Sequence, residues 1–438
     1  MRPARRLLLG GLAAGALLGA LPGVAAAADG AAIDTGDTAW MLIATALVMV
    51  MLPGLALFYG GLVRRKNVLS TIMHSFFGLA LVSVVWVLIG FSLAFGKDVG
   101  GLGLIGGLDF VGFMNVGLTP NPAYGPTIPF VLFAAFQLMF AAITPALITG
   151  AFAERKRFAA FVLFTILWSV VVYSPIAHWV WSTDGWLFKM GALDFAGGTV
   201  VHASSGISAL IVALLIGKRA VNGEGLEPHD IPMTVLGAGL LWFGWFGFNA
   251  GSSLHADGLA ANALLVTNTA AGAATITWVL ASWLHKKKVS VVGAACGAVA
   301  GLVAITPASG YVTAGGALFI GLAVGLICYS ATLLRERLRI DDALDVFAVH
   351  GVGGTFGAIA TGVFATSAIN AAGHGLIDGN AGQILTQLIA VGATIAYAVS
   401  ATFIIVKIVD VILGIRVNAR DEEMGLDKSV HGEVAYQV

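Results

Sequence analysis

The sequence predicts an all-α polytopic membrane protein with eleven transmembrane helices, and three observations indicate this fold class. First, the chain is 58% hydrophobic and only 11% charged, whereas soluble domains carry about 25% charged residues. Second, apolar runs of roughly 18 to 25 residues, the length that crosses a bilayer, recur along the chain. Third, basic residues cluster after every second run, as expected where alternate loops stay in the cytoplasm.

The apolar runs follow one another along the chain, with polar segments between them. We place the predicted helices at residues 40–63, 69–95, 127–152, 158–179, 199–216, 231–250, 259–284, 289–306, 311–334, 347–366 and 383–413. Glycine makes up 58 of the 438 residues, and small residues let transmembrane helices approach each other closely. Gly321 and Gly325, four positions apart, are expected to lie at such a contact.

Positive charge predicts the orientation of these helices. Basic residues cluster after the odd-numbered runs, whereas the loops after even-numbered runs hold only Lys97 and Lys189. The clusters are Arg64, Arg65 and Lys66; Arg155, Lys156 and Arg157; Lys218 and Arg219; Lys286, Lys287 and Lys288; Arg335, Arg337 and Arg339; and Arg416 and Arg420. Because basic loops stay in the cytoplasm, we expect the mature N-terminus outside and the C-terminus inside, which requires an odd number of helices.

The N-terminus has the pattern of a signal peptide, predicted at residues 1–28. Arg2, Arg5 and Arg6 form a basic start, and the apolar core that follows is too short to span a bilayer comfortably. The stretch "VAAAADG" offers a small-residue cleavage site. An uncleaved first helix is the alternative. The membrane domain is then expected at 29–414 and a cytoplasmic regulatory tail at 415–438.

An acid and a histidine recur at the same spacing in two segments, "ALDFAGGTVVHASSG" and "DALDVFAVHGVGG". Asp194 precedes His202 by eight positions, and Asp342 precedes His350 by the same interval. The repetition predicts two related halves, about 40–217 and 231–366, followed by a last helix at about 383–413. Five helices in each half would invert the second half, and inverted halves place a substrate path at their interface near the bilayer midplane.

The two histidines fall early in the fifth and tenth runs, which are equivalent positions in such halves. Ionisable residues inside a membrane are functional candidates, so His202 and His350 could meet across the pseudo-twofold axis. The alternative is that each satisfies a backbone carbonyl separately. Asp194 lies just before a helix, where a carboxylate can accept backbone N–H groups; attraction of a cation would be its second role. Asp342 and Asp345 are interpreted as structural or exit-side acids.

Several chemical classes lack a signal in this sequence. No Walker loop, zinc-ligand cluster or catalytic-triad spacing occurs, and "GLGLIG" lacks the strand–helix context of a nucleotide site. We therefore expect no enzyme activity, cofactor, metal or nucleic-acid partner. Cys296 and Cys328 are expected to be small packing residues. The other histidines are expected to be solvated or interfacial: His74, His178, His229, His255, His285, His374 and His431.

An aromatic block, "WFGWFGFNAGSS", ends the sixth run on the predicted outer side. Trp245 and Phe248 lie in it, near Ser252. One interpretation is an aromatic belt at the membrane interface. The other is a vestibule for cations, because aromatic faces attract desolvated cations and a serine hydroxyl can accept a hydrogen bond.

With these motifs in place, the sequence closely resembles the ammonium transporter family (Amt/Mep/Rh), and its bacterial Amt branch in particular. The matching blocks span nearly all of the mature chain. They are "PGLALFYGGLVRRKNVLS", "GAFAERKRF", "IAHWVW", "GALDFAGGTVVH", "WFGWFGFNAGS", "DVFAVHGVGG" and "GLDKSVHGEVAY". One departure is "ASSG" after His202, where relatives have an asparagine two positions on; Ser204 leaves the polarity of that wall open.

The resemblance implies a role for each residue that matches the family pattern. It implies an outer ammonium-recruiting site of Phe140, Trp181 and Ser252; a phenyl gate of Phe140 and Phe248; a pore histidine pair of His202 and His350; support of the outer site and proton handling by Asp194; and further pore-lining positions at Phe58, Tyr59, Trp245 and Val346. It also implies a homotrimer in the plasma membrane with one pore per subunit.

The implied substrate is ammonium or ammonia, with methylammonium as an analogue. Ammonium would be recruited outside and deprotonated, and ammonia would pass an apolar pore. The implied partner is a cytosolic PII-type signal protein, and the tail is expected to dock on the cytoplasmic face. The alternatives are an ammonium sensor and a membrane redox protein that uses the two histidines as haem ligands.

Overall fold

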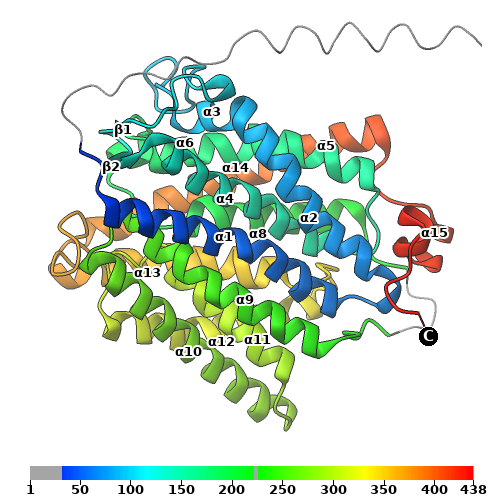
Figure 1. Ribbon diagram of the computed structural model, residues 1–438. Coiled ribbons are helices and arrows are strands. Elements are labelled where there is room, and N and C mark those ends of the chain that lie inside the picture. Colours follow the sequence, from blue (N-terminus) through cyan, green and yellow to red (C-terminus); the bar gives the residue numbers. More distant parts are fainter. Residues whose placement is uncertain (1–31, 221–224, 438) are drawn as a thin grey trace, which may run out of the picture.

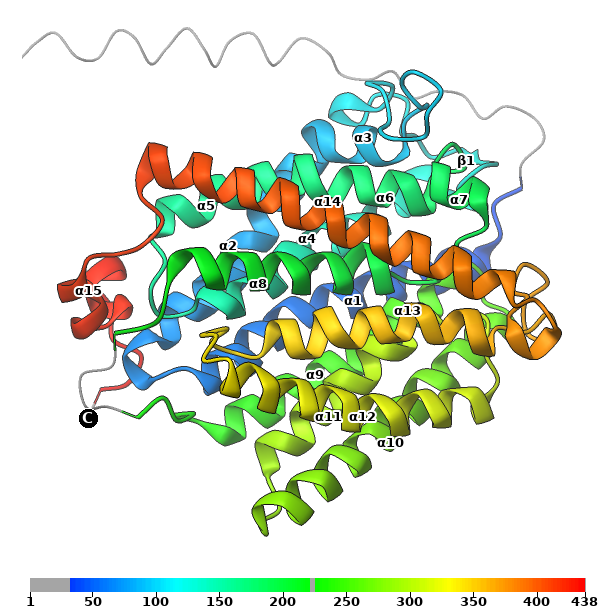
Figure 2. The ribbon, with the colours of Figure 1, turned by 180° about the vertical axis from the view of Figure 1, so that it is seen from behind.

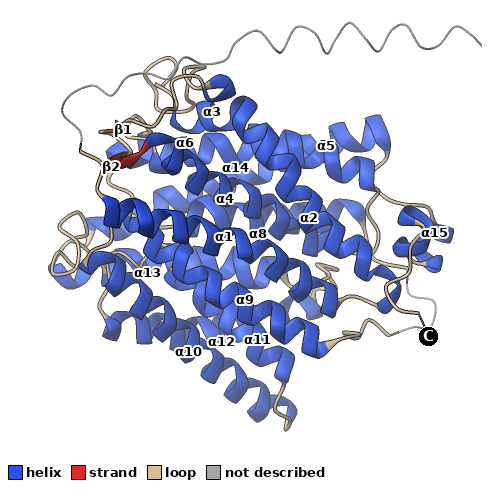
Figure 3. Ribbon diagram, viewed as in Figure 1, coloured by secondary structure: helices blue, strands red, loops and turns tan. Residues whose placement is uncertain are grey.

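The computed structural model describes residues 32–220 and 225–437 as a bundle of helices whose axes run in broadly the same direction (Figure 1). Strands are confined to one short antiparallel pair, β1 (Pro120–Asn121) and β2 (Gly125–Pro129), among the described residues (Figure 3). The all-α membrane fold is therefore confirmed. The predicted signal peptide, residues 1–28, lies outside the described residues.

The first half of the bundle contains five long helical segments, four of them built from two or four consecutive helices. They are α1 (Thr35–Leu62); η1 (Arg65–Asn67), α2 (Val68–Val85), η2 (Trp86–Gly90) and α3 (Phe91–Phe95); α4 (Phe130–Ile148) and η4 (Thr149–Phe152); α5 (Phe158–Trp168), η5 (Ser169–Tyr173), α6 (Ser174–Trp181) and α7 (Trp186–Met190); and η6 (Gly198–Ala203) and α8 (Ser204–Ile216). A short 3-10 turn, η3 (Val111–Phe113), lies in the long loop before β1.

The second half and the tail complete the bundle. They comprise α9 (Ile231–Ala250) and η7 (Gly251–Ser253); α10 (Gly258–Lys286); α11 (Val291–Ile305); α12 (Ala314–Arg337); η8 (Phe347–Val352) and α13 (Gly353–Phe364); η9 (Leu376–Asp378); α14 (Gly382–Leu413); α15 (Ala419–Met424); and η10 (Asp427–His431). Within the described residues, ten segments are long and apolar enough to span a membrane, and α11 is a shorter apolar helix. Each predicted run overlaps one of these segments, while the count of eleven spans and their orientation stay predictions.

Side chains set where these helices begin. The Asp34 carboxylate accepts a hydrogen bond from the backbone of Asp37 at 2.8 Å, so α1 starts before the apolar run that predicted it. Asp230, Asp257 and Ser290 cap α9, α10 and α11 in the same way. Such caps satisfy backbone N–H groups that have no partner inside the helix.

Glycines let the helices cross at short distances. A Cβ on Gly321 would lie 2.4 Å from the carbonyl oxygen of Ala270, and one on Gly325 would lie 2.5 Å from that of Ala274. The prediction that these two glycines mark a close helix contact is therefore confirmed, with α12 against α10. From behind, α14 crosses the bundle beside α8 and α13 (Figure 2). Many large apolar side chains on the outer surface are exposed, such as Phe76 and Val411, as a bilayer requires.

Candidate functional site

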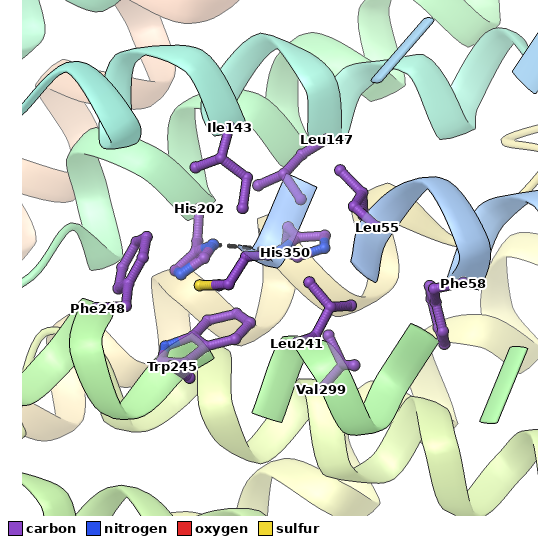
Figure 4. A pocket seen from close by; sticks show the side chains of 11 residues that line it. Leu55, Phe58, Ile143, Leu147, His202, Leu241, Trp245, Phe248, Val299 and His350 are labelled. Atoms are coloured by element: carbon purple, nitrogen blue, oxygen red, sulfur yellow. Dashed lines mark hydrogen bonds between the residues drawn. The ribbon is translucent and has the colours of Figure 1, made fainter. Parts of the chain in front are cut away.

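The two histidines singled out by the sequence meet in the centre of the bundle (Figure 4). His202 Nδ1 lies 3.2 Å from His350 Nδ1, and the ring planes are 25° apart. Both side chains are buried. In a hydrogen bond between two ring nitrogens, one must donate and the other must accept, so this contact suits a neutral pair or a pair that shares one extra proton.

Each histidine lies in a π-helical turn, His202 in η6 and His350 in η8. Such turns are rare and frequent at functional sites. Glycines bring the two turns together: a Cβ on Gly206 would lie 2.0 Å from the backbone nitrogen of Gly351, and one on Gly354 would lie 2.8 Å from the Cβ of His202. The rings can therefore touch because no side chain separates the two backbones.

The histidine pair borders a narrow apolar cavity, here called the histidine cavity. It leaves about 10 Å³ for the centre of a water-sized molecule, close to the need of a single such molecule. Its walls are Met51, Leu55, Phe58, Ile143, Leu147, His202, Leu241, Trp245, Phe248, Val299 and His350 (Figure 4). The Trp245 indole N–H donates to Thr306 Oγ1 at 2.8 Å, so this ring presents its apolar face to the cavity and stacks on His202.

Two phenyl rings separate the histidine cavity from a second cavity at the predicted outer end. Phe140 and Phe248 lie with ring centroids 4.2 Å apart, and both are buried. Phe248 borders the histidine cavity and Phe140 borders the second one. For any molecule to pass from one cavity to the other, these two rings must move apart.

The second cavity, here called the outer cavity, leaves about 160 Å³ for the centres of water-sized molecules. Phe140, Trp181 and Ser252 all line it, and Phe140 meets Trp181 edge to face at 5.7 Å. The Trp181 indole N–H donates to the backbone carbonyl of Asp194 at 2.9 Å. The Ser252 hydroxyl donates to the carbonyl of Phe248 at 2.9 Å, so its lone pairs remain available as acceptors.

The Asp194 carboxylate is a helix cap rather than a wall of the outer cavity. It accepts hydrogen bonds from the backbone N–H groups of Gly197, Gly198, Thr199 and Val200 and from the Thr199 hydroxyl. The side chain is buried. This geometry corresponds to the capping role that the sequence favours for Asp194, and its backbone holds Trp181 in place.

Asp342 lies at the equivalent position before His350, but its carboxylate accepts fewer hydrogen bonds than that of Asp194. One carboxylate oxygen accepts from the backbone of Phe347 at 2.7 Å, and the other has no hydrogen-bond partner among the described residues. Burial and the nearby Asp345 raise the pKa of Asp342 to about 6. Asp345 itself lies 2.6 Å from Arg335. The two acids of the repeated motif therefore differ in their surroundings.

The predicted pore positions do not all line one cavity. Phe58 and Trp245 line the histidine cavity, whereas Tyr59 and Val346 do not. Both are buried and flank Gly150, where an added Cβ would lie 2.8 Å from the Tyr59 ring and 2.7 Å from Val346. The Tyr59 hydroxyl donates to the carbonyl of Leu147 at 3.0 Å. Both residues therefore pack against Gly150 in η4 rather than lining the histidine cavity.

A third, open cavity, here called the inner cavity, lies at the predicted cytoplasmic end and leaves about 770 Å³ for the centres of water-sized molecules. Of these three cavities, it alone is lined by Lys, Arg, Asp or Glu side chains. Its charged walls are Lys218, Arg219, Lys286, Arg335, Glu336, Arg339, Asp341 and Asp345. Cys296 also borders it, and both cysteines are free thiols.

A buried ionic network beside the inner cavity has no counterpart in the sequence prediction. Glu154 pairs with Arg64 at 2.8 Å and with Arg219 at 3.5 Å, and Arg219 pairs with Asp341 at 2.7 Å. Burial alone would raise the pKa of Glu154, but Arg219 and Arg64 hold it below its usual value. The alternation of opposite charges in the sequence was the available signal, but spacing does not show which charges meet.

The tail packs against the same end of the bundle. The Asp427 carboxylate accepts from the backbone of Ser70 at 2.9 Å, at the start of α2, and Asn67 accepts from the backbone of Leu426 at 2.8 Å. Glu422 is buried and pairs with Arg416 at 2.7 Å. The expected docking of the tail is therefore present in the structure (Figure 1), while its regulatory role stays a prediction.

The expectation that the remaining histidines are solvated or interfacial is wrong for two of them. His74 lies among the rings of Phe152, Phe158 and Phe161, and His178 contacts the carbonyl of Ala94 and the carboxylate of Asp98. Both are 2% exposed or less. Hydropathy along the chain does not reveal the neighbouring helices that cover them.

Ser204, where the sequence departs from the family pattern, turns its hydroxyl back into its own helix. Its Oγ donates to the carbonyl of Val200 at 2.6 Å, and the side chain is buried. The hydroxyl proton is therefore used within the helix rather than offered to the path.

This succession of aromatic entrance, apolar passage and polar exit within a helical bundle defines a polytopic membrane transport protein. The family model described as Ammonium Transporter Family matches residues 39–436. The chain belongs to the ammonium transporter family.

Relatives cover almost the whole chain. It is 51% identical to an ammonium transporter of Bacillus subtilis (strain 168), over 92% of this chain and 99% of the relative. It is 48% identical to ammonium transporter Amt1 of Archaeoglobus fulgidus, over 92% and 100%. Among solved structures, Saccharomyces cerevisiae Mep2 matches with a TM-score of 0.83 and 39% identity, over 89% of this chain and 88% of that one. A structure named Sensor Amt Protein matches with a TM-score of 0.81 and 30% identity, over 90% and 98%.

Proposed function

We propose that this protein transports ammonium by recruiting it in the outer cavity, removing one proton, and passing ammonia through the histidine cavity. The observation that carries the proposal is the hydrogen-bonded pair His202–His350 inside an apolar passage. Membership of the ammonium transporter family supports the substrate. A transporter, not an enzyme, is the class that this family membership indicates.

Electrostatics explains why the proton must be left behind. Moving a bare ammonium-sized ion into hydrocarbon costs on the order of 20 kcal/mol by a Born estimate, and less after relaxation. A contact between a cation and an aromatic face returns only about 0.5 to 2 kcal/mol. The walls of the histidine cavity offer the cation no carboxylate. Neutral ammonia, by contrast, needs only hydrogen-bond partners.

The outer cavity suits the cation. The faces of Trp181 and Phe140 can attract it, and the lone pairs of the Ser252 hydroxyl can accept one of its N–H groups. Asp194 supports this site through its backbone contact with Trp181, and its carboxylate adds negative charge behind the site. Handling of the released proton by Asp194 is part of the proposal.

The histidine pair suits ammonia. A neutral imidazole can accept a hydrogen bond from ammonia or pass a proton on, and charging both rings at this distance would bring like charges together. Potassium has no proton to release, so it could enter the apolar passage only as an ion. Selectivity would then follow from chemistry rather than from size.

The oligomer and the partner are also proposals. We propose a homotrimer in the plasma membrane with one path in each subunit and a PII-type protein that binds at the inner cavity, because the family resemblance implies both. The division into a signal peptide (1–28), a membrane domain (29–414) and a regulatory tail (415–438), with the N-terminus outside, belongs to the same proposal. The haem alternative fits poorly, since the two histidine rings contact each other directly.

Ammonium sensing is the second candidate function, and the likeness to the structure named Sensor Amt Protein supports it. The two functions differ in whether substrate crosses the membrane. Protein reconstituted in liposomes and exposed to an ammonium pulse should produce a current or a change of internal pH. Protein-free liposomes are the control. If ammonium binds specifically but neither signal appears, transport is excluded and sensing remains the candidate function.

A further inference from the structure

Gln137 is a polar residue within the apolar helix α4, one turn before Phe140, and its side chain lines the outer cavity. Its Oε1 is buried and has no hydrogen-bond partner among the described residues. Leaving a buried acceptor unpaired is unfavourable, because the acceptor has lost its hydrogen bond to water and gained none in return. A carboxamide in this position therefore calls for a partner that enters the cavity.

The walls of the outer cavity offer Gln137 little else to bind. Three of its lining residues carry a hydroxyl or carboxamide group: Tyr124, Gln137 and Ser252. The Tyr124 hydroxyl is already engaged with Ser182 at 3.0 Å. The other walls are apolar or aromatic. The Tyr124 and Ser252 hydroxyls keep lone pairs beyond the hydrogen bonds they already make, but of these three side chains only Gln137 carries an acceptor with no partner among the described residues.

We infer that Gln137 is a second hydrogen-bond acceptor for the cation in the outer cavity. It would act together with the Ser252 hydroxyl, whereas the aromatic rings attract the cation through their faces. The inference rests on the proposed function and deepens it. Ammonium has four tetrahedral N–H donors: Ser252 accepts one, Gln137 accepts another, and Phe140 and Trp181 present ring faces to the rest. A half-turn of the carboxamide exchanges Oε1 and Nε2, so the acceptor can be presented to the cavity when the cation arrives.

A neutral acceptor suits this position better than a carboxylate. An amide oxygen attracts the cation through its dipole, yet it adds no charge that would stabilise ammonium against loss of its proton. Gln137 would therefore raise affinity while permitting the proton release that transport requires. A glutamate here should bind the cation more tightly and slow its deprotonation.

The test compares Gln137→Met, which keeps the length but removes the acceptor, with Gln137→Glu, which keeps an oxygen acceptor and adds charge. Currents are recorded from proteoliposomes over a range of ammonium concentrations. We expect Gln137→Met to raise the half-saturating concentration about 10- to 100-fold, as for loss of a hydrogen bond to a charged group. Gln137→Glu should lower that concentration and also lower the maximal rate.

Controls separate this inference from the proposed function and from misfolding. Thr269→Val removes a hydroxyl that bonds within α10, far along the chain from the cavity, and should leave the half-saturating concentration unchanged. Thermal unfolding in detergent checks that each variant is folded. If wild-type protein gives no ammonium signal, the proposed function fails. If wild-type protein transports and the Met and Glu variants shift in the same direction, or neither shifts, Gln137 is not a ligand.

Discussion

The two ends of the path start from the same motif and reach different chemistry. At the outer end, the Asp194 carboxylate is saturated by backbone and hydroxyl donors ahead of His202. At the inner end, Asp342 accepts a hydrogen bond from the backbone N–H of Phe347 ahead of His350 and keeps one oxygen without a partner among the described residues. The same Asp–His spacing therefore places two similar imidazole rings in contact, while the two carboxylates that precede them have different hydrogen-bond partners.

The cavities beside the two acids differ in the same sense. Aromatic rings dominate the outer cavity, whereas charged side chains of both signs line the inner one. In the proposed function, the aromatic outer cavity holds a partly desolvated cation, and the charged, open inner cavity returns ammonia to water. The following substitutions test this contrast, beginning with the largest expected effect.

Asp194→Asn should abolish transport or lower it at least a hundredfold. Both carboxylate oxygens accept N–H groups, so an asparagine must turn its NH₂ group toward at least one donor. A mismatched buried polar group costs about 1 to 3 kcal/mol, and the carbonyl that holds Trp181 would move with the backbone. Ammonium-driven current and thermal unfolding measure the two effects. Normal transport by this variant would contradict the account of the outer end.

Asp342→Asn should be far milder, which makes it the matched partner of the first substitution. An asparagine can keep its oxygen on the Phe347 N–H and place its NH₂ group where the unpartnered oxygen lies. We expect transport within about threefold of wild type. Near pH 4, where the Asp342 carboxyl is protonated and asparagine is its neutral equivalent, we expect a stability change below about 1 kcal/mol. Equal losses in Asp194→Asn and Asp342→Asn would show that the two ends are equivalent after all.

Stability should also depend on pH through Asp342. Its pKa is raised from 3.8 to about 6, so the folded state holds this proton more tightly than the unfolded state does. The contribution is therefore largest at acidic pH and is lost as pH rises through roughly 4 to 6, by up to about 3 kcal/mol. The melting temperature of wild type minus that of Asp342→Asn, measured across this range, should fall with pH. A flat difference would contradict the raised pKa.

Asp427→Asn tests the smallest effect, at the junction of the tail with the inner end. Its carboxylate caps the start of α2 through Ser70, and removing such a cap costs about 1 kcal/mol. We expect faster hydrogen exchange or proteolysis of the tail, with transport little changed. Glu423→Gln, at an exposed residue of α15, is the control outside this contact. Unchanged protection of the tail would show that Asp427 does not hold it.

Sequence periodicity could predict the helical fold because burial in lipid demands long apolar runs, and each run overlaps a helical segment of the structure. The boundaries of the helices were harder to predict from the sequence. The fourth predicted run stopped at residue 179, whereas α6 continues to Trp181, the residue that lines the outer cavity. Its indole N–H is satisfied by the Asp194 carbonyl, a contact between segments that hydropathy does not encode.

Only some residues of the candidate site could be predicted from the sequence. His202 and His350 stood out because their spacing repeats and because they interrupt apolar runs. Gln137 gave no such signal: one polar residue in an apolar run is ordinary, and only the cavity around it shows that its acceptor lacks a partner. Glu154 directly precedes the basic cluster Arg155, Lys156 and Arg157 in the sequence. It is nevertheless buried between Arg64 and Arg219, because its charge is paired with theirs.

The central claim is that a proton leaves the substrate before the passage, and ion replacement tests it most directly. Reconstituted protein is exposed in turn to equal gradients of ammonium, potassium and tetramethylammonium, the last of which carries no N–H group. The account predicts a current or an internal pH change with ammonium and none with the other two. Comparable transport of potassium or tetramethylammonium would show that intact cations cross, and would contradict it.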